Sequence, residues 1–317
     1  HRRNREPGLP DVPRRVSNSN DGIYAPRRAP VHEDLVLRGL RHRIIRWGPP
    51  SASPIVLLHG FLDVADTWQF LVDELPDDWS FVGLDWRGFG GSEWQPGGYW
   101  FTDYLADLEA LLALVASGPA RLLGHSMGGN IAALYGGIRP ERIAWTVNLE
   151  GVGLPQTSPD EAPGRYARWL DELAKRPRQT AYASESDLAK YLCSRNPRLP
   201  QARAAFLARA WTRRVGQRYH LAADPQHRVV NPVLYRRDEA EACWRRGVAP
   251  MLLMLGEQSE YRTRMGSWGA AGYLEAAFPH LTLVTLGGVG HMMHHEAPDA
   301  VARHIEHFVG QQISRNP

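Results

Sequence analysis

Short apolar runs alternate along the chain with segments whose apolar residues recur every three or four positions. A continuous apolar run is typical of a strand buried on both faces, whereas the longer spacing is typical of a helix with one buried face. Strands that alternate with helices predict an α/β fold with a mainly parallel sheet flanked by helices. The predicted strands lie in residues 35–47 (two strands), 54–60, 80–85, 121–124, 143–149, 250–255 and 281–286, and the predicted helices in 66–75, 103–115, 130–138 and 301–309.

The alternation stops between about residue 154 and residue 245, where arginine-rich helical stretches replace the strands. This segment predicts a helical insertion, residues 154–245, after the strand that ends near Leu149. The insertion would divide a core made of residues 31–153 and 246–317. Residues 1–30 show no hydrophobic period and are rich in Arg, Pro, Asn and Ser, which predicts a flexible basic arm.

The composition favours a globular protein that needs no disulfide framework and has no membrane span. The chain has 317 residues, of which 43% are hydrophobic and 22% charged, enough to bury a core without disulfide or metal staples. Its two cysteines, Cys193 and Cys243, do not form a C-x-x-C pair and predict no disulfide framework. No apolar run approaches the ~18 residues of a membrane span, and residues 1–30 lack the apolar stretch of a secretory signal. We therefore expect a cytoplasmic protein with no membrane span; the sequence does not indicate its oligomeric state.

The net charge of +3 hides a strong segregation. Basic residues outnumber acidic ones by seven to three in residues 1–30 and by 18 to 10 in residues 151–249, whereas the rest of the chain holds 12 basic and 21 acidic side chains. The opposite charges of insertion and core favour attraction between them. A competing role is that Arg213, Arg214 or Arg218 guides an anionic substrate. DNA binding through the basic arm is a third reading, which predicts salt-sensitive retention, but we expect no nucleic-acid partner.

One motif carries nucleophile chemistry. Residues 124–128, Gly-His-Ser-Met-Gly, fit G-x-S-x-G and lie between a predicted strand and a predicted helix. Glycines on both sides of Ser126 relieve crowding in a strained strand-to-helix turn, which exposes the hydroxyl above the sheet. The helix N-terminus behind Ser126 favours developing negative charge. We predict Ser126 as a nucleophile rather than an ordinary turn serine.

A serine nucleophile needs a base, and thirteen histidines compete for that role. His291 follows the last predicted strand, so its loop lies at the same carboxyl edge of the sheet as Ser126. We predict His291 as the base. His294, His295 and Glu296 follow closely and could suggest a metal site, but the spacing lacks the H-E-x-x-H pattern. A structural histidine cluster is the alternative, and we predict neither a metal nor a cofactor.

These segments together resemble the α/β-hydrolase superfamily, in the same order along nearly the whole core. The resemblance implies an oxyanion hole formed by the backbone N–H groups of Phe61 and Met127. It also implies that Asp85 and Arg87 shape a turn rather than catalyse. The matching segments are His59-Gly-Phe61, Asp85-Trp-Arg-Gly-Phe-Gly-Gly-Ser92, Gly124-His-Ser-Met-Gly-Gly129 and Gly290-His-Met-Met-His-His-Glu-Ala-Pro298.

The third member of the triad departs from the commonest pattern of this superfamily. Many relatives have Asp three residues after the glycine that matches Gly256, where this chain has Ser259. Glu150, at the end of the preceding strand, is similar to the acid of one haloalkane dehalogenase branch. We predict Glu150 as the acid that orients His291, with Glu260 as the alternative and Glu257 as a more distant one.

The residue types favour ester chemistry. Haloalkane dehalogenases use a carboxylate nucleophile, whereas Ser126 supports an acyl-enzyme on serine. We predict a carboxylesterase or lipase-like hydrolase acting on a small-molecule ester or thioester. Alternatives are a carbon–carbon bond hydrolase or lyase with the same Ser and His, and a ligand receptor with vestigial hydrolysis. Two substrate types stay open, an anionic ester and an ester with an apolar or aromatic group. Aromatic side chains in residues 86–104 would line a pocket for the second, although loop packing is the simpler role of these side chains. They are Trp86, Phe89, Trp94, Tyr99, Trp100, Phe101 and Tyr104.

Overall fold

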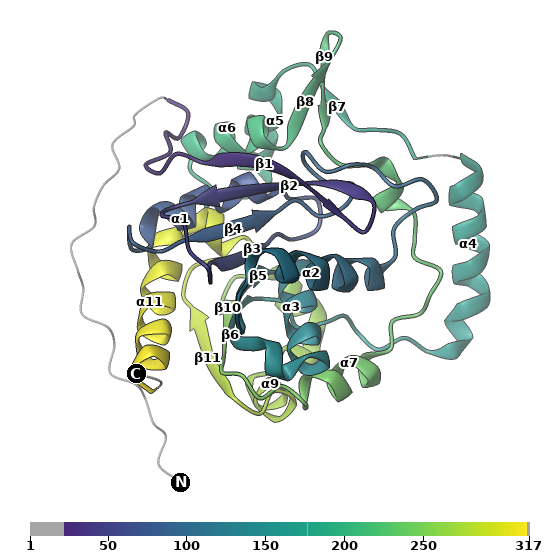
Figure 1. Cartoon of the computed structure of the whole chain (residues 1–317). Helices are drawn as coiled ribbons and strands as arrows, with labels where there is room; N and C mark the ends of the chain where they lie inside the picture. The colour runs from purple at the N-terminus through teal and green to yellow at the C-terminus, as the bar shows by residue number, and fades with distance from the viewer. Residues whose placement is uncertain (1–21, 176, 316–317) are drawn as a thin grey trace.

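The predicted strands assemble into one eight-stranded sheet with helices on both faces (Figure 1). The structure is a computed structural model and describes residues 22–175 and 177–315. The strand order is β1-β2-β4-β3-β5-β6-β10-β11; β2 pairs antiparallel with β1 and β4, and the remaining pairs are parallel. The strands are β1 (Val31–Leu37), β2 (Leu40–Trp47), β3 (Ile55–Leu58), β4 (Phe81–Leu84), β5 (Ala120–His125), β6 (Ile143–Leu149), β10 (Met251–Gly256) and β11 (Leu281–Leu286).

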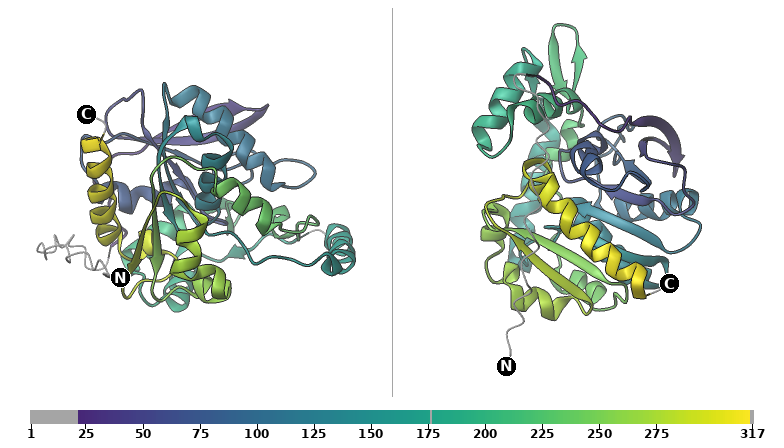
Figure 2. Two further views of the ribbon diagram at one scale, coloured as in Figure 1. Left: turned by 90° about the horizontal axis from the view of Figure 1, so that it is seen from below. Right: turned by 90° about the vertical axis from the view of Figure 1, so that its left-hand side faces the viewer.

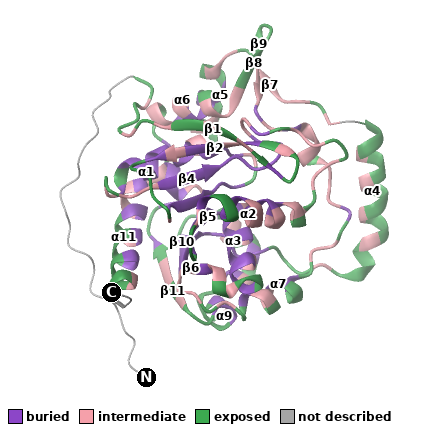
Figure 3. Ribbon diagram, in the orientation of Figure 1, coloured by how far each residue is buried: buried purple, intermediate pink, exposed green. Residues whose placement is uncertain are grey.

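Two helical layers bury this sheet. The central strands β3 and β4 are buried along their whole length, as their continuous apolar sequences require (Figure 3). One face packs against α1 (Gln69–Glu74), which follows the 3₁₀ turn η1 (Ala65–Trp68), and against α11 (Pro298–Arg315). The other face packs against α2 (Phe101–Val115), α3 (Met127–Ile138), α7 (Arg237–Trp244) and α9 (Ala271–Ala277). The predicted α/β fold with a mainly parallel sheet is confirmed.

The insertion differs from the predicted all-helical segment in two ways. First, it contains a small antiparallel sheet, because Gly216 adopts φ 60° and allows a tight hairpin turn. These strands are four residues or shorter and rich in Arg, so they give almost no apolar alternation. Second, α7 packs on the core sheet through Ala240 and Trp244 rather than standing above it. The other elements of the insertion are α4 (Ala162–Lys175), β7 (Ala181–Tyr182), α5 (Glu185–Arg195), α6 (Gln201–Ala210), β8 (Thr212–Val215) and β9 (Arg218–Leu221).

The helix α4 lies apart from the rest of the chain (Figures 1 and 2). None of its residues is buried, and Tyr166, Leu170 and Leu173 are exposed apolar side chains on it. Polar contacts attach α4 to the rest of the insertion. Arg165 donates from Nε to the carbonyl oxygen of Asn231 at 2.6 Å, and Glu172 accepts from the N–H of Val230 at 2.7 Å.

The predicted flexible arm also differs from the structure over residues 22–30. Tyr24 donates its hydroxyl to Asp73 Oδ2 at 2.8 Å, and the N–H groups of Arg27 and Arg28 donate to the two oxygens of the same carboxylate at 2.9 Å. Asp73 lies on α1, so this stretch is docked on the core. An arginine-rich segment without an apolar period gives no sequence signal for docking through one buried acid. Residues 1–21 of the predicted arm lie outside the described residues.

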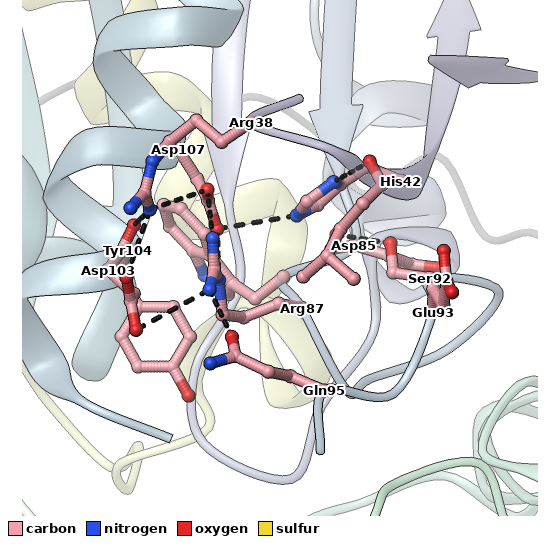
Figure 4. Close-up of polar contacts among 12 residues, drawn as sticks. Arg38, His42, Asp85, Arg87, Ser92, Glu93, Gln95, Asp103, Tyr104 and Asp107 are labelled. Atoms are coloured by element: carbon pink, nitrogen blue, oxygen red, sulfur yellow. Dashed lines mark hydrogen bonds and ion pairs between the residues drawn. The ribbon is translucent and has the colours of Figure 1, made fainter. Parts of the chain in front are cut away.

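The turn after β4 is fixed by buried polar contacts (Figure 4). Arg87 binds Asp107 of α2 through two short contacts of 2.6 Å, and His42 Nε2 lies 3.3 Å from the same carboxylate. Asp85 accepts the N–H groups of Ala65 and Gly91, and burial raises the pKa of Asp85 to about 7. Both residues therefore hold the backbone of this turn, in keeping with the structural role expected for them.

Within the described part of the chain, no helix has the length and apolar character needed to cross a bilayer.

Candidate active site

Ser126 lies in the turn between β5 and α3. Its backbone is strained, and the two glycines of the motif allow the chain to adopt this tight turn. Its φ of 51° and ψ of −111° are unusual for a residue other than glycine. A Cβ on Gly124 would lie 2.5 Å from the backbone of Gly128, and one on Gly128 would lie 2.0 Å from the carbonyl oxygen of Leu58. Close packing within the turn therefore requires glycine at position 124, and close packing against β3 requires glycine at position 128.

His291 reaches Ser126 from the loop that follows β11. Its Nε2 lies 3.0 Å from Ser126 Oγ, within hydrogen-bond distance. Its Nδ1 lies 2.6 Å from Glu150 Oε2. The ring is partly exposed, whereas the Glu150 side chain is completely buried. The structure thus brings together the three side chains predicted as nucleophile, base and orienting acid.

Three donors hold the Glu150 carboxylate at the end of β6. Its Oε1 accepts the N–H of Gly256 at 2.6 Å, and its Oε2 accepts both the Ser259 hydroxyl at 2.6 Å and the N–H at His291 Nδ1. The residue has φ 56°, a second strained position at this edge of the sheet. The alternative acid, Glu260, lies exposed at the start of α8 (Glu260–Met265), and Glu257 accepts the N–H of Gly288 instead.

Ser259 stands where the commoner pattern has an aspartate, and it contacts the acid that comes from another strand end. The residue that interrupts the commoner pattern is buried and directs its hydroxyl at the acid supplied by β6. The same oxygen accepts the N–H of Arg262 at 3.3 Å and caps α8. The sequence indicated only that an acid was missing from position 259; the hydroxyl's partner depends on the adjacency of β6 and β10.

We expect Ser259→Ala to lower the free energy of unfolding by about 2 kcal/mol or more, because it removes a hydrogen bond to a buried carboxylate and a helix cap. We also expect a fall in kcat much smaller than that caused by removing the carboxylate. Denaturant unfolding and ester kinetics measure the two effects. Ser267→Ala, at an exposed serine nearby, is the matched control. Equal stability of the two variants would contradict the contact.

The turn that carries Phe61 is held by a neutral histidine. The N–H of Trp86 donates to His59 Nε2 at 3.1 Å, so Nδ1 carries the ring proton and donates to the carbonyl oxygen of Gly60 at 2.7 Å. Burial lowers the pKa of His59 to about 4, which keeps the ring neutral. Among the described residues, no protein acceptor is assigned to the N–H groups of Phe61 and Met127. Both predicted oxyanion donors are therefore available to a ligand.

Two further residues contact the His291 loop, and sequence reasoning missed both. His125 Nε2 donates to the carbonyl oxygen of His291 at 2.9 Å. The Tyr261 ring centroid lies 4.9 Å from that of His291, and the Tyr261 hydroxyl donates to the carbonyl oxygen of Gly153. The position of His125 next to Ser126 was the available signal, whereas that of Tyr261 depends on the packing of α8.

The histidine cluster after His291 lies beneath the site rather than in it. His294 and His295 are buried, and both approach Asp63, two residues after Phe61. Burial and the neighbouring His295 lower the pKa of His294 to about 3. Burial opposes ionisation of Asp63, but the adjacent His295 and His294 outweigh it and hold the pKa of Asp63 well below its ordinary value.

The side chains considered for substrate recognition are distributed over several places. Arg213, Arg214 and Arg218 lie on the exposed β8–β9 hairpin, where the Arg213 guanidinium stacks 4.4 Å from the Trp94 ring centroid. Phe89 and Tyr99 enclose the His227 ring, with centroids 3.8 and 3.7 Å away. These aromatic contacts fasten the insertion to the core beside Phe61.

Comparison with known proteins places this geometry in context. A family model for the alpha/beta hydrolase fold matches residues 53–298. The chain is 27% identical over 276 residues to a serine hydrolase-like protein of Danio rerio, covering 84% of each chain. It is 24% identical over 263 residues to 2-(acetamidomethylene)succinate hydrolase of Mesorhizobium japonicum, covering 82% of this chain and 89% of that protein. The thioesterase domain from the curacin biosynthetic pathway superposes with a TM-score of 0.75 at 22% identity, covering 87% of this chain and 99% of that domain.

Proposed function

The chain belongs to the α/β-hydrolase fold family, and we propose that it is a serine hydrolase that cleaves a carboxylic ester through an acyl-enzyme. The observation that carries the proposal is the continuous contact from Ser126 Oγ to His291 Nε2 at 3.0 Å and from His291 Nδ1 to Glu150 Oε2 at 2.6 Å. The serine hydrolase-like relative of Danio rerio supports the reaction class. It does not identify the substrate.

The first half-reaction forms the acyl-enzyme. Ser126 Oγ attacks the ester carbonyl carbon while its proton passes to His291 Nε2. The carbonyl oxygen becomes an oxyanion near the free N–H groups of Phe61 and Met127, which stabilise its charge. Cleavage of the carbon–oxygen bond expels the alcohol, which takes the proton from His291.

The second half-reaction returns the enzyme to its resting state. Water gives a proton to His291 Nε2 and attacks the acyl carbon, and the proton then returns to Ser126 as the carboxylic acid leaves. Glu150 holds the Nδ1–H tautomer of His291 and stabilises the imidazolium. Its burial and its three donors suit this role.

The insertion contributes an aromatic side chain beside the oxyanion turn. The Phe61 ring lies 6.2 Å from that of His227, which comes from the insertion, and 6.0 Å from that of Phe89. An acyl or alcohol group held beside the oxyanion turn would meet this apolar surface. We propose that the insertion acts as a cap whose aromatic face favours apolar or aromatic esters.

We expect the purified chain to hydrolyse p-nitrophenyl esters with many turnovers and to be labelled by a fluorophosphonate probe at Ser126. A panel of acyl chain lengths, followed by mass spectrometry of the labelled peptide, measures both. Labelling of another residue would contradict the nucleophile. A labelled Ser126 with a single slow turnover on every ester would instead contradict the ester hydrolase and favour a receptor.

A further inference from the structure

Three buried donor atoms converge beneath the active site. Asp63 Oδ2 lies 3.5 Å from His295 Nε2 and 3.7 Å from His294 Nε2, and one ligand atom from each of the three residues lies within 4.8 Å of the others. All three side chains are 2% exposed or less. None of these three atoms has a hydrogen-bond partner among the described residues. Buried polar atoms rarely remain without partners, so the cluster requires an explanation.

Hydrogen bonding does not explain these separations. A hydrogen bond between nitrogen and oxygen spans about 2.7–3.2 Å, which both Asp63–histidine contacts exceed. Two ligands of one tetrahedral zinc ion, each bound at about 2.0–2.1 Å, lie about 3.3–3.5 Å apart. The observed 3.5 and 3.7 Å are close to this spacing. The two Asp63–histidine separations are therefore closer to the spacing of metal ligands than to that of hydrogen bonds.

The surroundings of Asp63 orient its free oxygen. Its other oxygen, Oδ1, accepts the N–H of Val64 at 2.9 Å, the Thr67 hydroxyl at 2.8 Å and the indole N–H of Trp211 at 2.7 Å. These neutral donors fix the carboxylate and leave Oδ2 facing the two histidines. Carboxylates that bind metals typically accept such hydrogen bonds from neighbouring residues, which fix their orientation.

Charge gives an independent argument for a cation. A carboxylate removed from water is costly unless a positive charge lies beside it. Within residues 22–175 and 177–315, the ion-pair partners of Asp63 are the two histidines, and no Lys or Arg pairs with it. Either an imidazolium or a bound cation must therefore balance the charge. Both Nε2–Oδ2 separations exceed the length of a hydrogen bond, so N–H donation from the two rings leaves Oδ2 unsatisfied, whereas a cation between the three atoms would satisfy it.

We propose that Asp63, His294 and His295 form a structural site for one divalent transition metal ion, with Zn²⁺ the ion best suited to two imidazoles and a carboxylate. Three protein donors leave one tetrahedral position for a water molecule. The ion would join the oxyanion turn to α10 (Met293–Glu296), which directly follows the loop of His291. It would thus fix the base relative to the oxyanion donors. This role needs no particular substrate and does not depend on the proposed ester chemistry.

The test measures metal in the full chain, free of any purification tag. Because the donors are buried, Zn²⁺ is supplied during expression and refolding. Elemental analysis after extensive dialysis should give about one zinc per chain. The zinc-loaded protein should melt about 5 °C above the chelator-treated protein. Asp63→Asn, which keeps the shape of the side chain, should lose the zinc, whereas His280→Gln, at an exposed histidine, should retain it.

The wild-type protein also gives a test that needs no variant. X-ray absorption at the zinc edge should report two imidazole nitrogens and oxygen ligands, and Co²⁺ refolded into the site should give the intense visible absorption of tetrahedral cobalt. Less than about a tenth of an equivalent of metal, with no change in melting temperature, would overturn the proposal in favour of a proton shared with Asp63. Equal zinc content in Asp63→Asn and wild type would overturn it as well. None of these readouts uses ester hydrolysis.

Discussion

Replacing Ser126 with alanine should lower kcat for ester hydrolysis by about 10⁴- to 10⁶-fold, because the change removes the only oxygen that His291 Nε2 can deprotonate in the triad. Binding and oxyanion stabilisation survive the change, so some rate above that of water should remain. The fold should be unaffected, because one partly exposed hydroxyl is lost. Initial rates on the best ester of the panel measure the effect.

The control for this result is Ser267→Ala, which changes an exposed serine distant in sequence from Ser126. It should keep full activity and full fluorophosphonate labelling, whereas Ser126→Ala should lose both. Undiminished hydrolysis by Ser126→Ala would refute the assignment of the nucleophile. A matched loss in both variants would point instead to general destabilisation.

Glu150→Gln should reduce kcat by about 10⁴-fold while leaving KM within a few-fold of its original value. A glutamine amide that turns its NH₂ toward His291 Nδ1 requires a lone pair there. The ring proton then moves to Nε2, which can no longer accept the proton of Ser126. The loss therefore comes from the wrong tautomer rather than from a missing side chain. Steady-state kinetics on the same ester separate kcat from KM.

Glu260→Gln is the matched control, because it makes the same change at the competing acid. Glu260 is exposed at the start of α8, and Glu150 already occupies Nδ1 of His291. We expect the Glu260 variant to keep its rate within about twofold, as surface substitutions usually have small effects. A larger loss in Glu260→Gln than in Glu150→Gln would reverse the assignment of the acid.

The fold could be predicted where the apolar positions along the chain are also the positions that the structure buries. Strands such as β3 and β4 are apolar at every position because both faces of a parallel sheet are covered, and this leaves a clear signal in the sequence. The β8–β9 hairpin left none, because its exposed arginines follow no apolar alternation. The docking of residues 22–30 was hidden as well, because it rests on hydrogen bonds to Asp73 and on the packing of the single ring of Tyr24 against Phe70, which leave no periodic pattern.

In the candidate site, too, some residues could be predicted from the sequence and one could not be settled by it. Ser126 and His291 were predictable because both lie in glycine-rich turns at the carboxyl ends of strands, where parallel topology brings loops together. Glu150 was one of three acids that the sequence left open. The folded chain distinguishes them by their positions: Glu150 lies 2.6 Å from His291 Nδ1, whereas Glu260 is exposed. The catalytic roles of all these residues stay predictions that the variants above would test.

The amino-acid sequence alone predicts the order of strands and helices in the core, the strained serine turn and the histidine at the same edge of the sheet. Each of these depends on residues close together in the chain, where apolar spacing and glycine positions act directly. Three contacts become visible only in the folded chain: that of Glu150 with His291, that of Ser259 with Glu150, and that of Asp63 with His294 and His295. These contacts join residues separated by more than 100 positions, and side-chain chemistry alone does not specify which distant partners the packed sheet brings within bonding distance.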